Sequence, residues 1–132
     1  MTDLFTPEQY QRLINNGMPE NYSKDHCPVV RLHILFTGCQ WLLTELDPEN
    51  PNIAFGLCDL GLGFPELGYV DLEEVKAVKT VPFPVMRDFF FEAKYPISVY
   101  ADAARYHSHI TIEDEDLQHL ANVNKPSDFS PQ

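Results

Sequence analysis

The carboxylate side chains are the residues of this 132-residue chain with the clearest capacity for chemistry. No lysine or arginine lies between Arg31 and Lys76, and this stretch holds eight acidic residues. They are Glu45, Asp47, Glu49, Asp59, Glu66, Asp71, Glu73 and Glu74. Acidic side chains at this density can attract a basic partner, bind a divalent cation, assist hydrolysis, or simply keep a surface solvated.

The leading hypothesis is a non-enzymatic module that binds a basic protein through this acidic stretch. A negative surface speeds the encounter with a positive one and discriminates against acidic surfaces. The same surface can occupy the groove that a partner uses for the phosphates of DNA or RNA. The expected contact residues are Glu45, Asp47, Glu49, Asp59, Glu66, Glu73 and Glu74.

The alternative hypothesis is a small carboxylate- or metal-dependent hydrolase. It requires that Glu45, Asp47, Asp59 and Glu66 converge, which their spacing does not establish. Adjacent antiparallel strands bring Glu45 and Asp59 within reach in only some registers. A third possibility is a structural or regulatory subunit that associates through an aromatic patch near Phe90.

The remaining candidate sites have weaker patterns. His26, Cys27, Cys39 and Cys58 lack the close pairing typical of zinc ligands. The alternating pair His107 and His109, with Glu113 nearby, is a second minor metal candidate. The segment 61–63 lacks the lysine of a phosphate-binding loop, so its glycines predict tight turns. We expect no catalytic residue, no cofactor and no metal.

An α+β domain is the fold class that the apolar patterning predicts: an antiparallel sheet of four or five strands with two or three helices packed on one side. Residues 1–121 form this single domain, and residues 122–132 are an expected flexible tail. A capping box at Thr6 and Gln9 begins the first helix, and Gly17 is expected to end it in a left-handed turn. Asp71 is expected to cap a second helix over residues 72–78. A further helix is expected over residues 96–106, with a helical turn at 117–121.

The expected strands cover residues 28–36, 40–46, 53–59 and 86–91, with an edge strand at 108–112. Within 40–46, alternation places Leu42, Thr44 and Leu46 on one face and Trp41, Leu43 and Glu45 on the other. Residues 60–68 are expected to form an irregular loop. In the run 89–91, Phe90 must face away from its neighbours, and burial under a helix is the expected outcome.

The formal net charge of −11 argues against direct binding of nucleic acid or anionic membranes. No apolar run approaches the roughly 20 residues of a membrane-spanning helix, and the first residues do not resemble a signal peptide. Three cysteines are not a disulfide framework. A cytoplasmic location is therefore expected.

Two segments carry a family resemblance: residues 41–48, Trp-Leu-Leu-Thr-Glu-Leu-Asp-Pro, and residues 54–70, which include Cys-Asp-Leu-Gly-Leu-Gly-Phe-Pro. The chain resembles the bacterial domain-of-unknown-function family numbered 2958, from about Thr6 to Tyr106. Members of that family are short acidic proteins often carried on plasmids and other mobile elements. The resemblance implies no catalytic residues, but it suggests an antagonist of host defence, of anti-restriction or anti-CRISPR type.

Overall fold

A computed structural model describes residues 4–78 and 82–123 of the chain. The strands in this part are β1 (Val30–Ile34), β2 (Cys39–Asp47), β3 (Asn50–Leu60), β4 (Glu66–Asp71) and β5 (Val85–Arg87). The helices in the same part are α1 (Pro7–Asn16), α2 (Leu72–Ala77), α3 (Ile97–His107) and α4 (Asp114–Val123). Among the described residues, no helix has the length and apolar character needed to cross a membrane. Residues 124–132, most of the expected tail, lie outside the described part.

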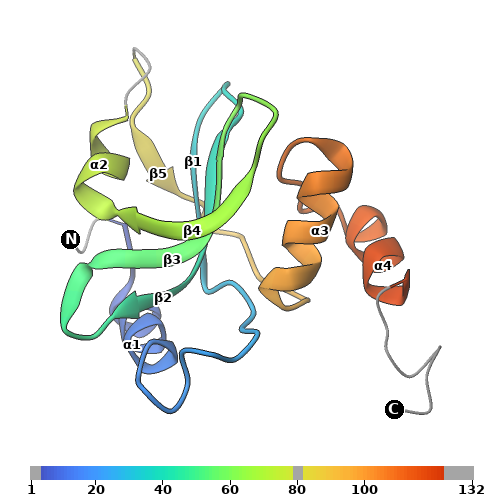
Figure 1. Cartoon of the computed structure of the whole chain (residues 1–132). Helices are drawn as coiled ribbons and strands as arrows, with labels where there is room; N and C mark the ends of the chain where they lie inside the picture. Colours follow the sequence, from blue (N-terminus) through green and yellow to red (C-terminus); the bar gives the residue numbers. More distant parts are fainter. Residues whose placement is uncertain (1–3, 79–81, 124–132) are drawn as a thin grey trace, which may run out of the picture.

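The strands form one sheet in the order β4-β3-β2-β1-β5, in which all neighbours are antiparallel (Figure 1). The predicted α+β class and the antiparallel sheet are therefore confirmed. One predicted strand is not formed, and another segment forms a strand instead. Residues 66–71, whose first part was expected to be loop, form β4, whereas residues 108–112 connect α3 to α4 without forming a strand.

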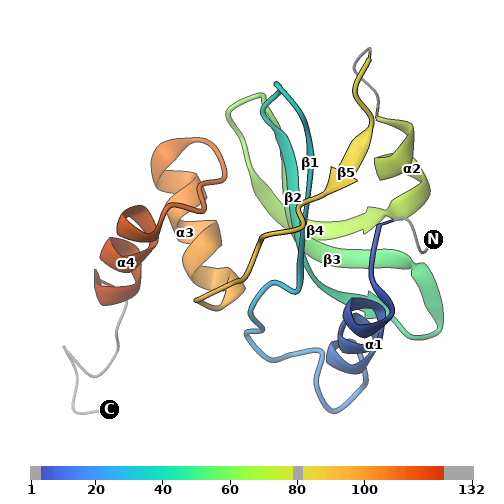
Figure 2. The same ribbon diagram turned by 180° about the vertical axis from the view of Figure 1, so that it is seen from behind.

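Helices cover both faces of the sheet rather than one (Figures 1 and 2). One core contains Trp41 and Leu43 of β2 together with residues of α1 and α2. The second core contains Leu42 of β2 with residues of α3 and α4. The reason is that β2 is apolar on both sides, since residues 41–43 are all fully buried. An uninterrupted apolar run of this kind requires cover on two faces.

The predicted start of α1 is confirmed and its predicted end is wrong. Thr6 and Gln9 form a capping box, with each side chain accepting a hydrogen bond from the backbone of the other. Gly17 has φ −88°, which is right-handed, so conformational freedom is not why glycine stands there. A Cβ atom at Gly17 would overlap the carbonyl oxygen of Leu46. The glycine therefore permits α1 to end directly against the backbone of β2.

A bulge in β2 breaks the predicted alternation of side chains. Leu43 pairs with Gly56 and Glu45 pairs with Phe55, so Thr44 is the extra residue. The backbone carbonyl of Thr44 accepts a hydrogen bond of 2.9 Å from the side-chain amide of Asn16 on α1. Beyond the bulge, Leu46 joins the same core as Trp41 and Leu43. Glu45 is consequently turned to the opposite face.

Candidate functional site

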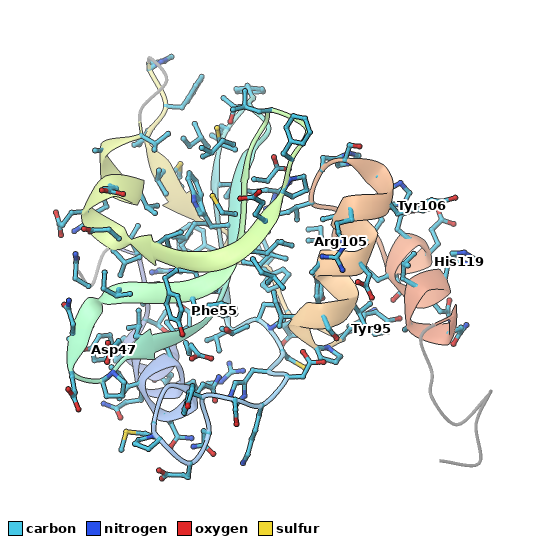
Figure 3. The ribbon with its side chains drawn as sticks, viewed as in Figure 1. Asp47, Phe55, Tyr95, Arg105, Tyr106 and His119 are labelled. Atoms are coloured by element: carbon cyan, nitrogen blue, oxygen red, sulfur yellow. The ribbon has the colours of Figure 1, made fainter. Side chains whose placement is uncertain are left out.

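Three of the predicted carboxylates line one hollow at the end of the β2–β3 hairpin. The hollow has a volume of about 520 Å³ and is bordered by Glu45, Asp47 and Glu49. Its other walls are Gly17, Met18, Pro19, Tyr22, Pro48, Phe55 and Tyr69. Figure 3 shows Asp47 near the turn of the hairpin and Phe55 on the adjoining part of β3. Among the residues that the structure describes, none that lines the hollow is a lysine or arginine.

Local structure holds the two sides of the hollow in place. On the hairpin side, the Asp47 carboxylate accepts a hydrogen bond of 2.9 Å from the backbone N–H of Glu49, which orders the turn around Pro48. On the other side, the chain leaving α1 folds back, and the N–H of Tyr22 donates to the carbonyl of Met18 at 2.9 Å. A ring nitrogen of His26 lies 2.8 Å from the carbonyl oxygen of Asn21 and fixes the end of this segment.

Glu45 is the unusual residue of the hollow because it is only 7% exposed. Within the described part of the chain, its carboxylate accepts no hydrogen bond and forms no ion pair. Burial raises the pKa of Glu45, and the charge of His26 offsets only part of that increase. The charged form of Glu45 is therefore less stable than that of a solvated carboxylate, and the residue borders the hollow.

An aromatic row lies beside Glu45. The sheet register places Phe55 opposite Glu45, and Tyr69 opposite Phe55. The two rings meet edge to face, with centroids 5.1 Å apart. Tyr22 adds a third ring to the lining from the segment after α1. None of these three rings was among the predicted site residues; for Tyr22, a tyrosine in an otherwise polar loop was the available signal.

Asp59 does not belong to the acidic surface, which corrects one of the predicted contact residues. It is 1% exposed, and its carboxylate accepts hydrogen bonds from the N–H groups of Ile110 (2.9 Å) and Gly61 (2.8 Å). Its partner across the strands is Gln40, whose amide donates to the carbonyl of Ile110 at 3.1 Å. Asp59 therefore anchors the α3–α4 connection to the sheet.

The other predicted contact residues lie outside the hollow. Glu66 borders a different depression, which also contains Arg105. Glu73 is exposed on α2 and forms an ion pair of 3.3 Å with Lys76, whereas Glu74 is exposed beside it. Asp71 caps α2 through the N–H of Glu73, as predicted. The acidic stretch is therefore divided among four places (the hollow, the interior at Asp59, the depression at Glu66, and α2) rather than forming one continuous face.

The strand register bears on two of the carboxylates that the hydrolase alternative would bring together. Glu45 lies opposite Phe55 and Asp59 opposite Gln40, so the register separates the two carboxylates. No group of three histidine, cysteine or acidic side chains in residues 4–78 and 82–123 is arranged to hold a metal ion. His107 pairs with Asp116 at 3.6 Å, and Cys27, Cys39 and Cys58 are free thiols.

The phenylalanine run differs from the expected burial. The fourth predicted strand is shorter and ends at Arg87, so residues 89–91 form a turn and the segment that follows it. Phe89 is 70% exposed and Phe90 is 93% exposed, whereas Phe91 packs against Tyr100 with ring centroids 6.3 Å apart. The exposure of Phe90 is the condition that the contact-surface alternative requires.

Comparison with known proteins gives a family and no described activity. The family model named "Protein of unknown function (DUF2958)" matches residues 4–111, which include every residue that lines the hollow. No curated protein and no solved structure shows a significant match to the chain.

Proposed function

The chain belongs to the DUF2958 family, and we propose that it is a non-enzymatic module that binds a protein with a basic surface through the acidic end of its β2–β3 hairpin. One observation carries the proposal. Glu45, Asp47 and Glu49 line a single hollow, and within residues 4–78 and 82–123 no lysine or arginine lines it with them. An uncompensated negative charge of this kind favours a cationic ligand.

The exposure of the hairpin residues supports binding of a macromolecule. Asp47 and Glu49 are both exposed and stand in a tight turn, so their charges are presented at the surface in fixed positions. Because neither residue has an ion-pair partner among the described residues, no competing contact has to be broken when a partner docks. Preorganised charges lose less entropy on association.

The partner that we propose is a protein that handles nucleic acids. Surfaces that bind phosphates are rich in lysine and arginine, and they are the common source of a strong positive field. An acidic protein on such a surface excludes the nucleic acid. The mobile-element setting that the family resemblance suggests favours a host defence enzyme of restriction or CRISPR type as the target.

A charge-reversal experiment tests this proposal. The wild-type chain, D47K/E49K and the control E92K/E115K are immobilised and exposed to host lysate at low salt. The control changes the net charge by the same amount through two exposed glutamates that do not line the hollow. The captured protein is then identified and purified, and its binding to labelled DNA or RNA is measured with increasing amounts of each variant.

We expect the wild type and E92K/E115K to capture a nucleic-acid-binding protein and to displace its labelled DNA or RNA, whereas D47K/E49K does neither. Retention of capture by D47K/E49K would contradict the proposal. Nucleic-acid binding that an excess of the wild-type chain leaves unchanged would contradict the proposed competition.

A further inference from the structure

Glu45 and the rings around it form a site whose chemistry is more specific than a negative surface. An isolated buried carboxylate is costly unless it is paired or hydrogen-bonded. Glu45 is 7% exposed, has no hydrogen bond or ion pair within the described part of the chain, and borders the hollow. The described residues therefore offer the Glu45 carboxylate no hydrogen-bond donor, and a ligand that enters the hollow would supply one.

The aromatic rings limit which donors fit. Phe55 and Tyr69 follow Glu45 across the sheet, and Tyr22 lines the same hollow from the segment after α1. Tyr22 is 58% exposed and Tyr69 is 68% exposed, so both rings have surface available to a ligand. Aromatic faces attract cations through the negative charge of the π-system. A carboxylate with aromatic rings beside it is suited to an organic cation.

We propose that this hollow binds an alkylguanidinium group, with Glu45 as its ion-pair partner and Tyr22, Phe55 and Tyr69 as its aromatic walls. This inference rests on the proposed function, since it assigns an arginine side chain of the basic partner to the site. Asp47 and Glu49 at the border of the hollow attract the cation during approach, whereas Glu45 pairs with it at the end.

Three properties favour guanidinium over ammonium. A planar guanidinium donates two parallel hydrogen bonds to one carboxylate, which a lysine ammonium cannot match. It is less strongly hydrated, so its entry to a site beside a buried residue costs less. Its flat face also stacks on aromatic rings. These properties correspond to the carboxylate, the burial and the rings that the hollow provides.

The test uses the full ¹⁵N-labelled chain and four probes, followed by amide chemical shifts. The probes are acetyl-Gly-Arg-Gly-amide, its lysine counterpart, its neutral citrulline counterpart, and free agmatine. We expect the arginine peptide to shift the amides of Glu45, Phe55 and Tyr69, the lysine peptide to bind several-fold more weakly, and the citrulline peptide to cause no shift. Glu45→Gln should weaken arginine-peptide binding by about tenfold or more, the loss expected for one charge-assisted interaction.

Controls keep the result interpretable. Phe55→Leu should weaken binding several-fold while Glu92→Gln, outside the hollow, leaves it unchanged, and each spectrum reports whether the variant is folded. Equal binding of the citrulline and arginine peptides, or unchanged affinity in a folded Glu45→Gln variant, would overturn the guanidinium site. Agmatine that binds as tightly as the peptide would identify a free small cation as the source, and weaker binding would identify a protein arginine.

The two proposals can fail separately. If no arginine probe binds but D47K/E49K still loses capture of the basic partner, the guanidinium site is wrong and the acidic binding surface stands. If the arginine peptide binds while D47K/E49K retains capture, the site stands and the proposed docking surface is wrong.

Discussion

Glu45 stands where the requirements of folding and of binding oppose each other. Its burial beside Phe55, without a hydrogen-bond donor among the described residues, destabilises the charged carboxylate. Asp59 is buried to a greater extent, yet its two oxygens each accept a backbone hydrogen bond. The two acidic residues are therefore opposites: Asp59 stabilises the fold, whereas Glu45 costs stability and remains available to a ligand.

Replacement of Glu45 by glutamine should therefore stabilise the free protein at neutral pH. Burial raises the pKa of Glu45 above its ordinary value of 4.5, so the folded state binds more protons than the unfolded state above that pH. Stability from this group is greatest below pH 4.5 and decreases as the pH rises through the folded pKa. We expect Glu45→Gln to equal the wild type near pH 4 and to exceed it at pH 7 by roughly 1 kcal/mol, within the penalty of an unsatisfied buried group.

Urea denaturation at both pH values measures this difference. Glu49→Gln is the matched control, because Glu49 is exposed and its replacement should not change the free energy of unfolding at either pH. A Glu45→Gln variant that is less stable than the wild type at pH 7 would show that the carboxylate is a stabilising group. A stability difference between the two proteins that does not vary with pH would show that ionisation of Glu45 is not its cause.

The sequence identified the acidic residues but not their environments. Glu45, Asp47 and Asp59 are all acidic residues of one stretch, and the sequence does not distinguish them. The strand register makes Glu45 a buried residue of the hollow, Asp47 an exposed charge of the hairpin and Asp59 a buried structural anchor. The position of Phe55 and Tyr69 beside Glu45 was not predictable for the same reason. Phe55 and Tyr69 become neighbours of Glu45 only through the pairing of three strands.

At the level of elements, the site depends on how closely α1 approaches β2. Asn16 donates to the carbonyl of Thr44 at the bulge, and Gly17 lies against the carbonyl of Leu46. The bulge turns Glu45 toward the hollow, and the end of α1 directs residues 18–22 along its wall. A contact between helix and strand thus sets the geometry of the carboxylate and of Tyr22 together.

Gly17→Ala should disturb both stability and binding. The added methyl group would overlap the Leu46 carbonyl oxygen, and relief of the overlap requires that α1 move away from β2. We expect a loss of about 1–3 kcal/mol in the free energy of unfolding, the usual cost of overpacking. Arginine-peptide affinity should fall as well. Gly68→Ala is the control: apart from its chain neighbours, no atom of the described residues lies within 4 Å of its added Cβ, so stability should be unchanged or higher. Equal stability of the two variants in chemical denaturation would contradict this account.

Local signals predicted the elements that have local causes. The capping box at Thr6 and the cap at Asp71 correctly located α1 and α2. β4 was missed because Pro65 and Gly68 are typical of loops, and its pairing with β3 overrides that local preference. The bulge at Thr44 was also not predictable, because the residue types alternate through it without interruption. In the structure, the bulge exchanges the two faces of β2, so that Leu46 lies on the same face as Leu43.

For the whole molecule, a net charge of −11 opposes folding and favours binding to a basic partner. Repulsion among the acidic residues opposes the compact state, whereas the same charges attract a basic partner. Salt screens both effects, because the screening length falls from about 10 Å at 0.1 M to about 3 Å at 1 M. The acidic surface therefore makes the unbound chain less stable in the conditions where binding is strongest.

An increase in sodium chloride from about 0.1 to 1 M should raise the free energy of unfolding and weaken binding to the basic partner in the same protein. E92K/E115K, which moves the net charge from −11 to −7, should show a smaller stabilisation by salt, because less repulsion remains to be screened. Its binding should keep the wild-type dependence on salt, since the charges at the hollow are intact. Urea denaturation and a partner titration at each salt concentration measure the two responses. Affinity that stays constant across this range would show that the acidic hairpin end does not recognise its partner by charge.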